Sequence, residues 1–445
     1  PAAANAGYSW VEVRLTDAGS GIQNRQWGHS YRIEDFRRPE FEVTTEIDTA
    51  GPYLRTDPII VTGAATYFSG GPLPDAEVDW RVWSTDASYS PPGWDQFTFG
   101  VWVPWWFEDG FGRGRSLDGI ADRGFEGGFG EPGQEPERFT GRTDSAGRHA
   151  LQLDFDADTV DLPVTVTAQA AVTDVNRQTF SSDANLLVHP ADVYVGLRSD
   201  RTFVRRGESL DIEAIVADID GSAVPGRSMT VEAARLVWEY TGEGWERTEQ
   251  DLQTCTETSG AVPVTCSFDA DKGGEYRIRA VVTDQVGRTH RSEMSRWVSG
   301  ADRPPDRGLQ LEAATLIPDR QEYEPGDVAE ILVDAPFEDG HGLLTIARNG
   351  VVETRTFEFD GTSAVLEIPI EDAYIPGVEL LVEVVGAAER RADDGTPLPE
   401  APDRPAFATA QLRLDVPPVT RALSVETRPA ATTLEPGEET DVEVY

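Results

Sequence analysis

Short runs of alternating apolar and polar residues recur along the whole sequence, and this period of two constrains the fold more than any other feature. Clear examples are FEVTTEI at 41–47, LDIEAIVA at 210–217, YRIRAVVTD at 276–284, AVLEIPI at 364–370 and ELLVEVV at 379–385. Gly, Pro and Asp turns break the runs at short intervals, and no long amphipathic helical pattern competes with them. The sequence therefore predicts an all-β protein made of antiparallel β-sandwiches.

A repeated turn-and-strand motif indicates that these sandwiches are arranged in tandem. FVRRGESLDIEAIV (203–216), YEPGDVAEILV (323–333) and LEPGEETDVEVY (434–445) share an apolar residue, a tight turn at Gly, an acidic residue and a strand. The turn glycines, Gly207, Gly326 and Gly437, are spaced by about the length of one sandwich domain. A chain of 445 residues is also too long for a single core.

The charge balance argues against two classes of partner. The formal net charge is −41, and such a field repels nucleic acid phosphates and anionic lipid head groups. We therefore expect no nucleic acid partner. The simplest interpretation of the acidic surface is that it keeps the protein soluble.

The only two cysteines, Cys255 and Cys266, lie in TCTETSGAVPVTC. Their short separation, with TSG placed to turn between two strand-like runs, favours a disulfide that staples a hairpin over a metal site, which needs more ligands. Two buried thiols are the alternative. A disulfide would indicate an oxidising compartment outside the cytoplasm.

The stretch FGVWVPWWFEDGFGRGRS (99–116) is a long insertion between two predicted strands. Leaving Trp102, Trp105, Trp106 and Phe107 all exposed would create an apolar patch that few soluble monomers tolerate. We expect them to pack on the sheet or on a neighbouring domain. A binding surface for a partner or glycan, and insertion into a membrane, are the alternatives.

Catalytic and metal-binding motifs are absent from the sequence. Its five histidines are scattered without an HExxH motif, no GxSxG motif occurs, and the single Lys272 is in no Walker loop. DFDADTVD (154–161) and VADIDGS (216–222) are better explained as turns than as calcium loops. We predict no catalytic residues, no metal and no cofactor.

Four stretches together resemble a known family. They are YRIEDFRRPEFEVTTEID, GAATYFSGGPLPDAEVDWRV, FVRRGESLDIEAIVADIDGSAVPGRSMTVEA and LIPDRQEYEPGDVAEILV. They resemble the macroglobulin-like, fibronectin- or Ig-like domains of the bacterial alpha-2-macroglobulin family. The resemblance implies the end of one such domain at 1–38, complete domains at 39–190, 191–302 and 308–417, and the start of another at 418–445.

The family resemblance implies a role in protease trapping, in which a protease cuts a bait segment and is then enclosed. Many members also carry a reactive thioester in a Cys-Gly-Glu-Gln type motif, but here Cys255 is followed by TET and Cys266 by SFD. The expected role is therefore a scaffold for bait and capture parts that lie outside this chain. On its own, the chain is expected to inhibit no protease. The alternative is an Ig-like surface adhesin or glycan-binding array with the tryptophans as its platform.

The expected location is extracytoplasmic, in the periplasm or at the cell surface, with a cell-envelope partner. No run of 18 apolar residues occurs, so no direct membrane insertion is expected. The sequence lacks an initiating Met and ends within a strand pattern, which suggests an excised piece; lipid anchoring through a missing N-terminus is left open. Proline-bearing segments at 300–308 and 415–421 are candidate pivots between domains.

Overall fold

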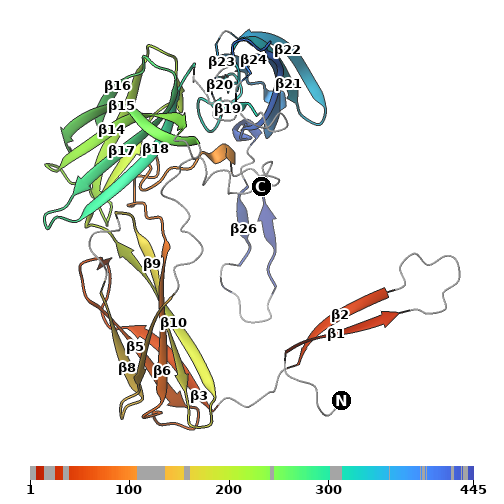
Figure 1. Cartoon of the computed structure of the whole chain (residues 1–445). Coiled ribbons are helices and arrows are strands. Elements are labelled where there is room, and N and C mark those ends of the chain that lie inside the picture. Colours follow the sequence, from red (N-terminus) through yellow and green to blue (C-terminus); the bar gives the residue numbers. More distant parts are fainter. Residues whose placement is uncertain are drawn as a thin grey trace.

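The computed structural model shows an all-β chain in which three two-layer sandwiches follow one another (Figure 1). It describes residues 7–14, 26–33, 40–107, 136–154, 161–240, 245–300, 313–359, 361–390, 392, 396, 398–421, 425–431, 433 and 439–445. Within these ranges the regular elements are β-strands and three short 3-10 helices. The predicted fold class is confirmed.

The first sandwich, residues 41–189, packs a three-stranded sheet on a five-stranded sheet. The small sheet has the order β3 (Phe41–Ile47), β5 (Ile59–Tyr67), β8 (Arg148–Leu153), and the large one β4 (Tyr53–Leu54), β10 (Thr179–His189), β9 (Val164–Thr173), β6 (Glu77–Asp86), β7 (Glu137–Arg142). Alternate residues of β9 are buried between the layers. Trp80 of β6 is fully buried there, and its Nε1–H donates to Nδ1 of His149 at 3.0 Å.

The second sandwich, residues 193–298, repeats this arrangement strand for strand. Its small sheet has the order β11 (Val193–Arg198), β13 (Ser209–Asp218), β16 (Val264–Asp269), and its large sheet β12 (Phe203–Val204), β18 (Thr289–Val298), β17 (Gly274–Thr283), β14 (Ser228–Tyr240), β15 (Trp245–Thr258). As in the first sandwich, the two-residue strand pairs in parallel with its neighbour and the long strands pair antiparallel.

The third sandwich, residues 315–415, keeps the same order with one strand fewer. Its sheets are β19 (Thr315–Pro318), β20 (Val328–Asp334), β23 (Ser363–Pro369) and β22 (Val351–Phe359), β21 (Gly340–Ala347), β24 (Gly377–Ala388), β25 (Arg404–Asp415). A single parallel bridge between Glu322 and Asp415 replaces the pairing that β12 makes in the second sandwich. The three sandwiches are thus copies of one topology.

Two small hairpins flank the sandwiches in the sequence. β1 (Gly7–Arg14) pairs with β2 (Gln26–Ile33), drawn in red in Figure 1, and β26 (Thr427–Pro429) pairs with β27 (Val442–Val444). The 3-10 helices η2 (Asp372–Tyr374) and η3 (Val419–Arg421) are joined by an ion pair of 2.6 Å between Arg421 and Asp372. This pair ties the segment after the third sandwich back to it.

The repeated turn has the same geometry in the second and third sandwiches. Gly207 and Gly326 have φ angles of 86° and 102°, a region that glycine adopts without steric cost. Their N–H groups donate to the carbonyls of Ala270 and Ile370 at 2.9 and 2.8 Å. Gly437 lies outside the described residues.

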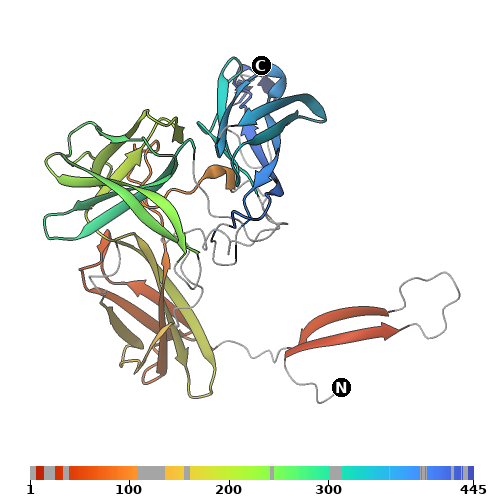
Figure 2. The same cartoon turned by 45° about the horizontal axis from the view of Figure 1, so that its top comes forward.

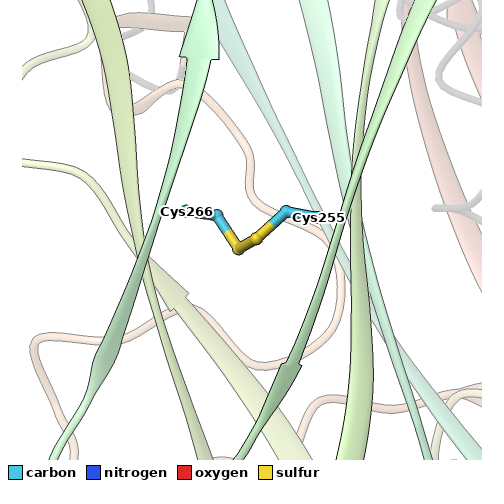
Figure 3. The surroundings of a disulfide bond; sticks show 2 residues. All are labelled: Cys255 and Cys266. Carbon is cyan, nitrogen blue, oxygen red and sulfur yellow. A yellow bond between two sulfur atoms is a disulfide. The ribbon is translucent and has the colours of Figure 1, made fainter.

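Cys255 and Cys266 are joined by a disulfide, but not across a hairpin (Figure 3). Cys255 lies on β15, which pairs with β14, whereas Cys266 lies on β16, which pairs with β13 in the other sheet. The predicted hairpin is therefore wrong, because the TSG segment takes the chain from one layer to the other. The bond links the two layers of the second sandwich, and closing its short loop stabilises the fold by about 3 kcal/mol.

Candidate functional site: a strap across two domain seams

The tryptophan-rich motif belongs to a segment that leaves the first sandwich and reaches the other two. We call residues 87–107, which follow the end of β6, the strap. The equivalent connections, β14 to β15 and β21 to β22, need only residues 241–244 and 348–350. The strap therefore begins a long insertion at a point where the other two sandwiches have only a short connection in the sequence.

Backbone hydrogen bonds hold the strap on the second sandwich. Thr98 and Leu197 of β11 exchange N–H···O bonds of 2.8 and 3.0 Å. Glu293 of β18 donates its N–H to the carbonyl of Gly100 at 2.8 Å and accepts one from Trp102 at 2.8 Å. Because β11 and β18 belong to different sheets, the strap bridges the two layers along one side of this sandwich.

Two glycines of the second sandwich leave room for the strap. A Cβ added to Gly196 would lie 2.6 Å from the ring of Phe99, and one added to Gly221 would lie 2.2 Å from the carbonyl oxygen of Pro92. Both distances are below any normal contact. The close approach of the strap thus depends on these two positions lacking a side chain.

We call the contact between the first and second sandwiches the first seam, and there the strap packs aromatic side chains on the second sandwich. The cluster comprises Phe97, Phe99, Tyr194 and Ile215, with Tyr89, Trp94, Ile219 and Ala223 packed against them. The polar atoms at its edge are satisfied, because Tyr89 Oη donates to the carbonyl of Ile219 at 2.5 Å and Trp94 Nε1 to that of Gly221 at 2.9 Å.

Three titratable side chains are buried in the first seam. His189 Nδ1 and Tyr194 Oη share a hydrogen bond of 2.6 Å, and His290 Nδ1 accepts one of 3.1 Å from the N–H of Val195. Burial lowers the pKa of His189; burial, aided by the charge of Arg291, lowers the pKa of His290 to about 3. Burial also raises the pKa of Tyr194. All three groups are therefore neutral at neutral pH.

We call the contact between the second and third sandwiches the second seam, and indole rings dominate it. Trp102 and Trp106 of the strap pack against Phe203 and Trp297 of the second sandwich and against Ile317, Leu332 and Val365 of the third. The centroid of Trp106 lies 5.8 Å from those of both Trp102 and Trp297. Figures 1 and 2 show the 3-10 helix η1 (Trp105–Phe107), in orange, between the two sandwiches.

Direct hydrogen bonds and ion pairs reinforce the second seam. Thr202 donates its N–H to the carbonyl of Asp319 at 3.0 Å and its hydroxyl to that of Pro318. Glu330 of β20 forms ion pairs with Arg201 and, at 3.4 Å, with Arg205. The third sandwich is thus bonded to the second at several points besides the strap.

The structure brings three of the four predicted contact residues together. The Trp105 centroid lies 5.9 Å from Trp102 and 4.6 Å from Trp106, and all three indoles are partly buried. Their rings meet at 67–89°, so they form no coplanar platform of the kind that a glycan-binding array would use. The side chain of Phe107 lies outside the described part of the chain.

The two candidate pivots are only partly described. Residues 301–308 lie outside the described ranges, while Gly300 donates its N–H to Ser363 Oγ at 2.7 Å. In the second pivot, Val416 donates its N–H to the carbonyl of Pro376 at 3.1 Å. Sequence reasoning did not find the residues that bond the second seam, because no local pattern distinguishes Thr202 or Glu330 from the other polar residues of the chain.

The described residues contain no group of three or more His, Cys, Asp or Glu side chains that could hold a metal ion. In the stretch 154–161, for which the sequence predicts a turn, residues 155–160 lie outside the described ranges, and Asp161 forms an ion pair of 2.9 Å with Arg291. In the same parts of the chain, no helix is long and apolar enough to cross a membrane.

Comparison with known proteins finds similarity to alpha-2-macroglobulins. Residues 314–445 match the model of the alpha-2-macroglobulin bait region domain. An alpha-2-macroglobulin homolog from Nostoc sp. is 20% identical over 424 residues, covering 93% of this chain and 21% of the relative. One from Deinococcus radiodurans is 27% identical over 184 residues, covering 39% and 18%. Trypsin-activated alpha-2-macroglobulin from Escherichia coli aligns with 99% of this chain and 28% of its own, at 15% identity and a TM-score of 0.40.

Sandwiches of one topology, joined in tandem and bound together by a strap, define a multidomain β-sandwich protein. The chain is similar to the alpha-2-macroglobulin family, over residues 314–445 for the bait region model and over most of its length for the Nostoc relative. It spans about a fifth of the length of the two curated relatives.

Proposed function

We propose that this chain is the scaffold of a broad-spectrum protease inhibitor that traps proteases after its bait segment is cut. The strap is the observation that carries the proposal. One continuous segment starts in the first sandwich, hydrogen-bonds to the second and packs against the third. A trap that rearranges after cleavage needs a part that keeps its shape, and a strap across two seams supplies it.

The cleavable and reactive parts are proposed to lie outside the three sandwiches. Both cysteines of the chain are in the disulfide, so neither offers a thiol for a thioester. The matched family model carries the bait region in its name and covers residues 314–445. We therefore place the bait in or beyond the final hairpin of β26 and β27, and assign no catalytic role to this chain.

An extracytoplasmic location, in the periplasm or at the cell surface, is part of the same proposal. The disulfide between the layers of the second sandwich is of a kind that persists in oxidising compartments. The partners would be proteases, met through the parts of the protein outside the sandwiches.

Brief digestion of the full-length parent protein with several unrelated proteases tests the proposal. We expect cuts confined to one segment, at or beyond residues 427–445, together with a compact shift on native electrophoresis and retention of the protease. Cuts scattered through the three sandwiches, with no shift, would contradict it. This chain alone, used as the control, should inhibit none of the same proteases.

A further inference from the structure

A pocket of about 200 Å³ opens beside the second seam, where the strap and two sandwiches meet. The strap supplies the indoles of Trp102 and Trp105, the second sandwich supplies Arg296 and Ser199, and the segment after β19 supplies Gln321. The pocket is smaller than those that hold drug-sized ligands, so it suits a molecule no larger than a monosaccharide.

Arg296, which lines this pocket, is a buried cation without a counter-ion. Its residue is 4% exposed and its guanidinium lies 4.9 Å from the ring centroid of Trp102. One nitrogen, Nη1, donates to the carbonyl of Ser295 at 2.7 Å, while Nε is buried without an acceptor. Among the described residues no carboxylate forms an ion pair with it, and burial lowers its pKa to about 9.

The other arginines of the pocket differ from Arg296 in having their own carboxylates. Arg198 pairs with Glu213 at 2.7 Å, and Arg320 pairs with Asp327 at 3.2 Å. A buried guanidinium left unpaired is costly, whereas one that meets an oxyanion in a two-point hydrogen bond is among the strongest polar contacts in proteins. An anion bound in the pocket would therefore pair with this guanidinium and offset the cost of its burial.

The charges lining the pocket favour a monoanion. Of the three arginines that line it, Arg198 and Arg320 also pair with the lining carboxylates Asp200 and Asp319, at 3.5 and 3.8 Å, so Arg296 is the one that has no carboxylate partner. The two carboxylates would repel a phosphate dianion, but they can accept hydrogen bonds from hydroxyl groups. The indoles offer apolar surface for the C–H groups of a small ring.

We propose that this pocket binds a small hydroxylated organic acid of the uronic acid class, with its carboxylate on Arg296 and its ring against Trp102 and Trp105. The ligand would contact the strap and the second and third sandwiches at once. Its binding would therefore tighten the second seam.

Calorimetric titration of the full chain with glucuronate tests the proposal, with glucose and inorganic phosphate as comparison ligands. We expect one saturable site for glucuronate and at least about tenfold weaker binding of the other two, because glucose lacks the charge and phosphate is repelled by the acidic residues. Equal binding of glucose, stronger binding of phosphate, or no saturable binding of glucuronate would overturn the assignment.

Two matched variants distinguish binding in the pocket from a general effect of positive charge at the second seam. Arg296→Gln should weaken glucuronate binding at least about tenfold, whereas Arg205→Gln, which removes the same charge from the seam outside the pocket, should change it by less than about threefold. Unchanged binding in folded Arg296→Gln would refute the role of Arg296. If that variant does not fold, Trp105→Ala, which removes a partly exposed wall, must show the loss instead.

Discussion

At the first seam the strap packs on Tyr194 next to buried histidines, whereas at the second it packs on Trp297 next to a buried arginine. The first seam buries His189 and His290 as neutral groups, and its contacts are mainly aromatic rings. The second joins Trp102, Trp106 and Trp297 and adds ion pairs at its edge. One segment thus meets two kinds of surface, and we expect the first seam to respond to acid and the second to loss of packing volume.

The largest effect should come from emptying the second seam. Trp297 is 9% exposed and contacts the strap indoles of Trp102 and Trp106, so Trp297→Ala should destabilise the chain by about 3–5 kcal/mol through lost burial and a cavity. Calorimetric unfolding should then show the third sandwich melting separately and earlier. Trp10→Ala, at a 62% exposed position on β1, is the control and should change stability by less than about 0.5 kcal/mol.

Acid should weaken the first seam by a smaller amount. Unfolded histidine takes up a proton near its ordinary pKa of 6.5, whereas folded His290 stays neutral down to about 3. Between those values the unfolded chain binds the extra proton, so stability falls as the pH falls, by about 2 kcal/mol from pH 6.5 to about pH 5.

The pH dependence of urea unfolding measures this effect. His290→Gln should flatten the slope below pH 6.5, while His341→Gln, at an exposed position, should leave it unchanged. An equally steep slope in His290→Gln would place the acid response elsewhere in the molecule.

A methyl group added at position 196 should push the strap away from the second sandwich and lower the stability of the chain by about 1–3 kcal/mol. In Gly196→Ala the new Cβ would lie 2.6 Å from the ring of Phe99, which must move. Adding Phe99→Leu removes the atom that clashes and should recover part of the loss, as a double-mutant cycle in chemical unfolding would show. If the stability losses of the two substitutions simply add, the ring of Phe99 is not affected by a side chain at position 196.

Several of these features could be predicted from the sequence and others could not, for physical reasons. Alternation in strands such as β9 predicts the layers, because one face of each strand must be buried. The hairpin predicted from the TSG segment was wrong, because a turn signal does not show whether the next strand pairs in the same sheet or crosses to the other sheet. The bulk of Trp102 and Trp106 predicts burial, but periodicity cannot say against which domain. The unpaired state of Arg296 depends on what surrounds it in space, so no local motif marks it.

The ion pairs at the rim of the second seam should contribute least. Glu330 pairs with Arg201 and Arg205, whose side chains are 40% and 48% exposed, so solvent and salt screen both pairs. Glu330→Gln should therefore cost less than about 1 kcal/mol at low salt and almost nothing in high salt. Thermal unfolding at two salt concentrations checks this, with Glu358→Gln, on the exposed face of β22, as a control that should cost nothing at either. A loss that persists in high salt would show that the second seam is held by these charges as well as by its indoles, and the contrast between the two seams would then need revision.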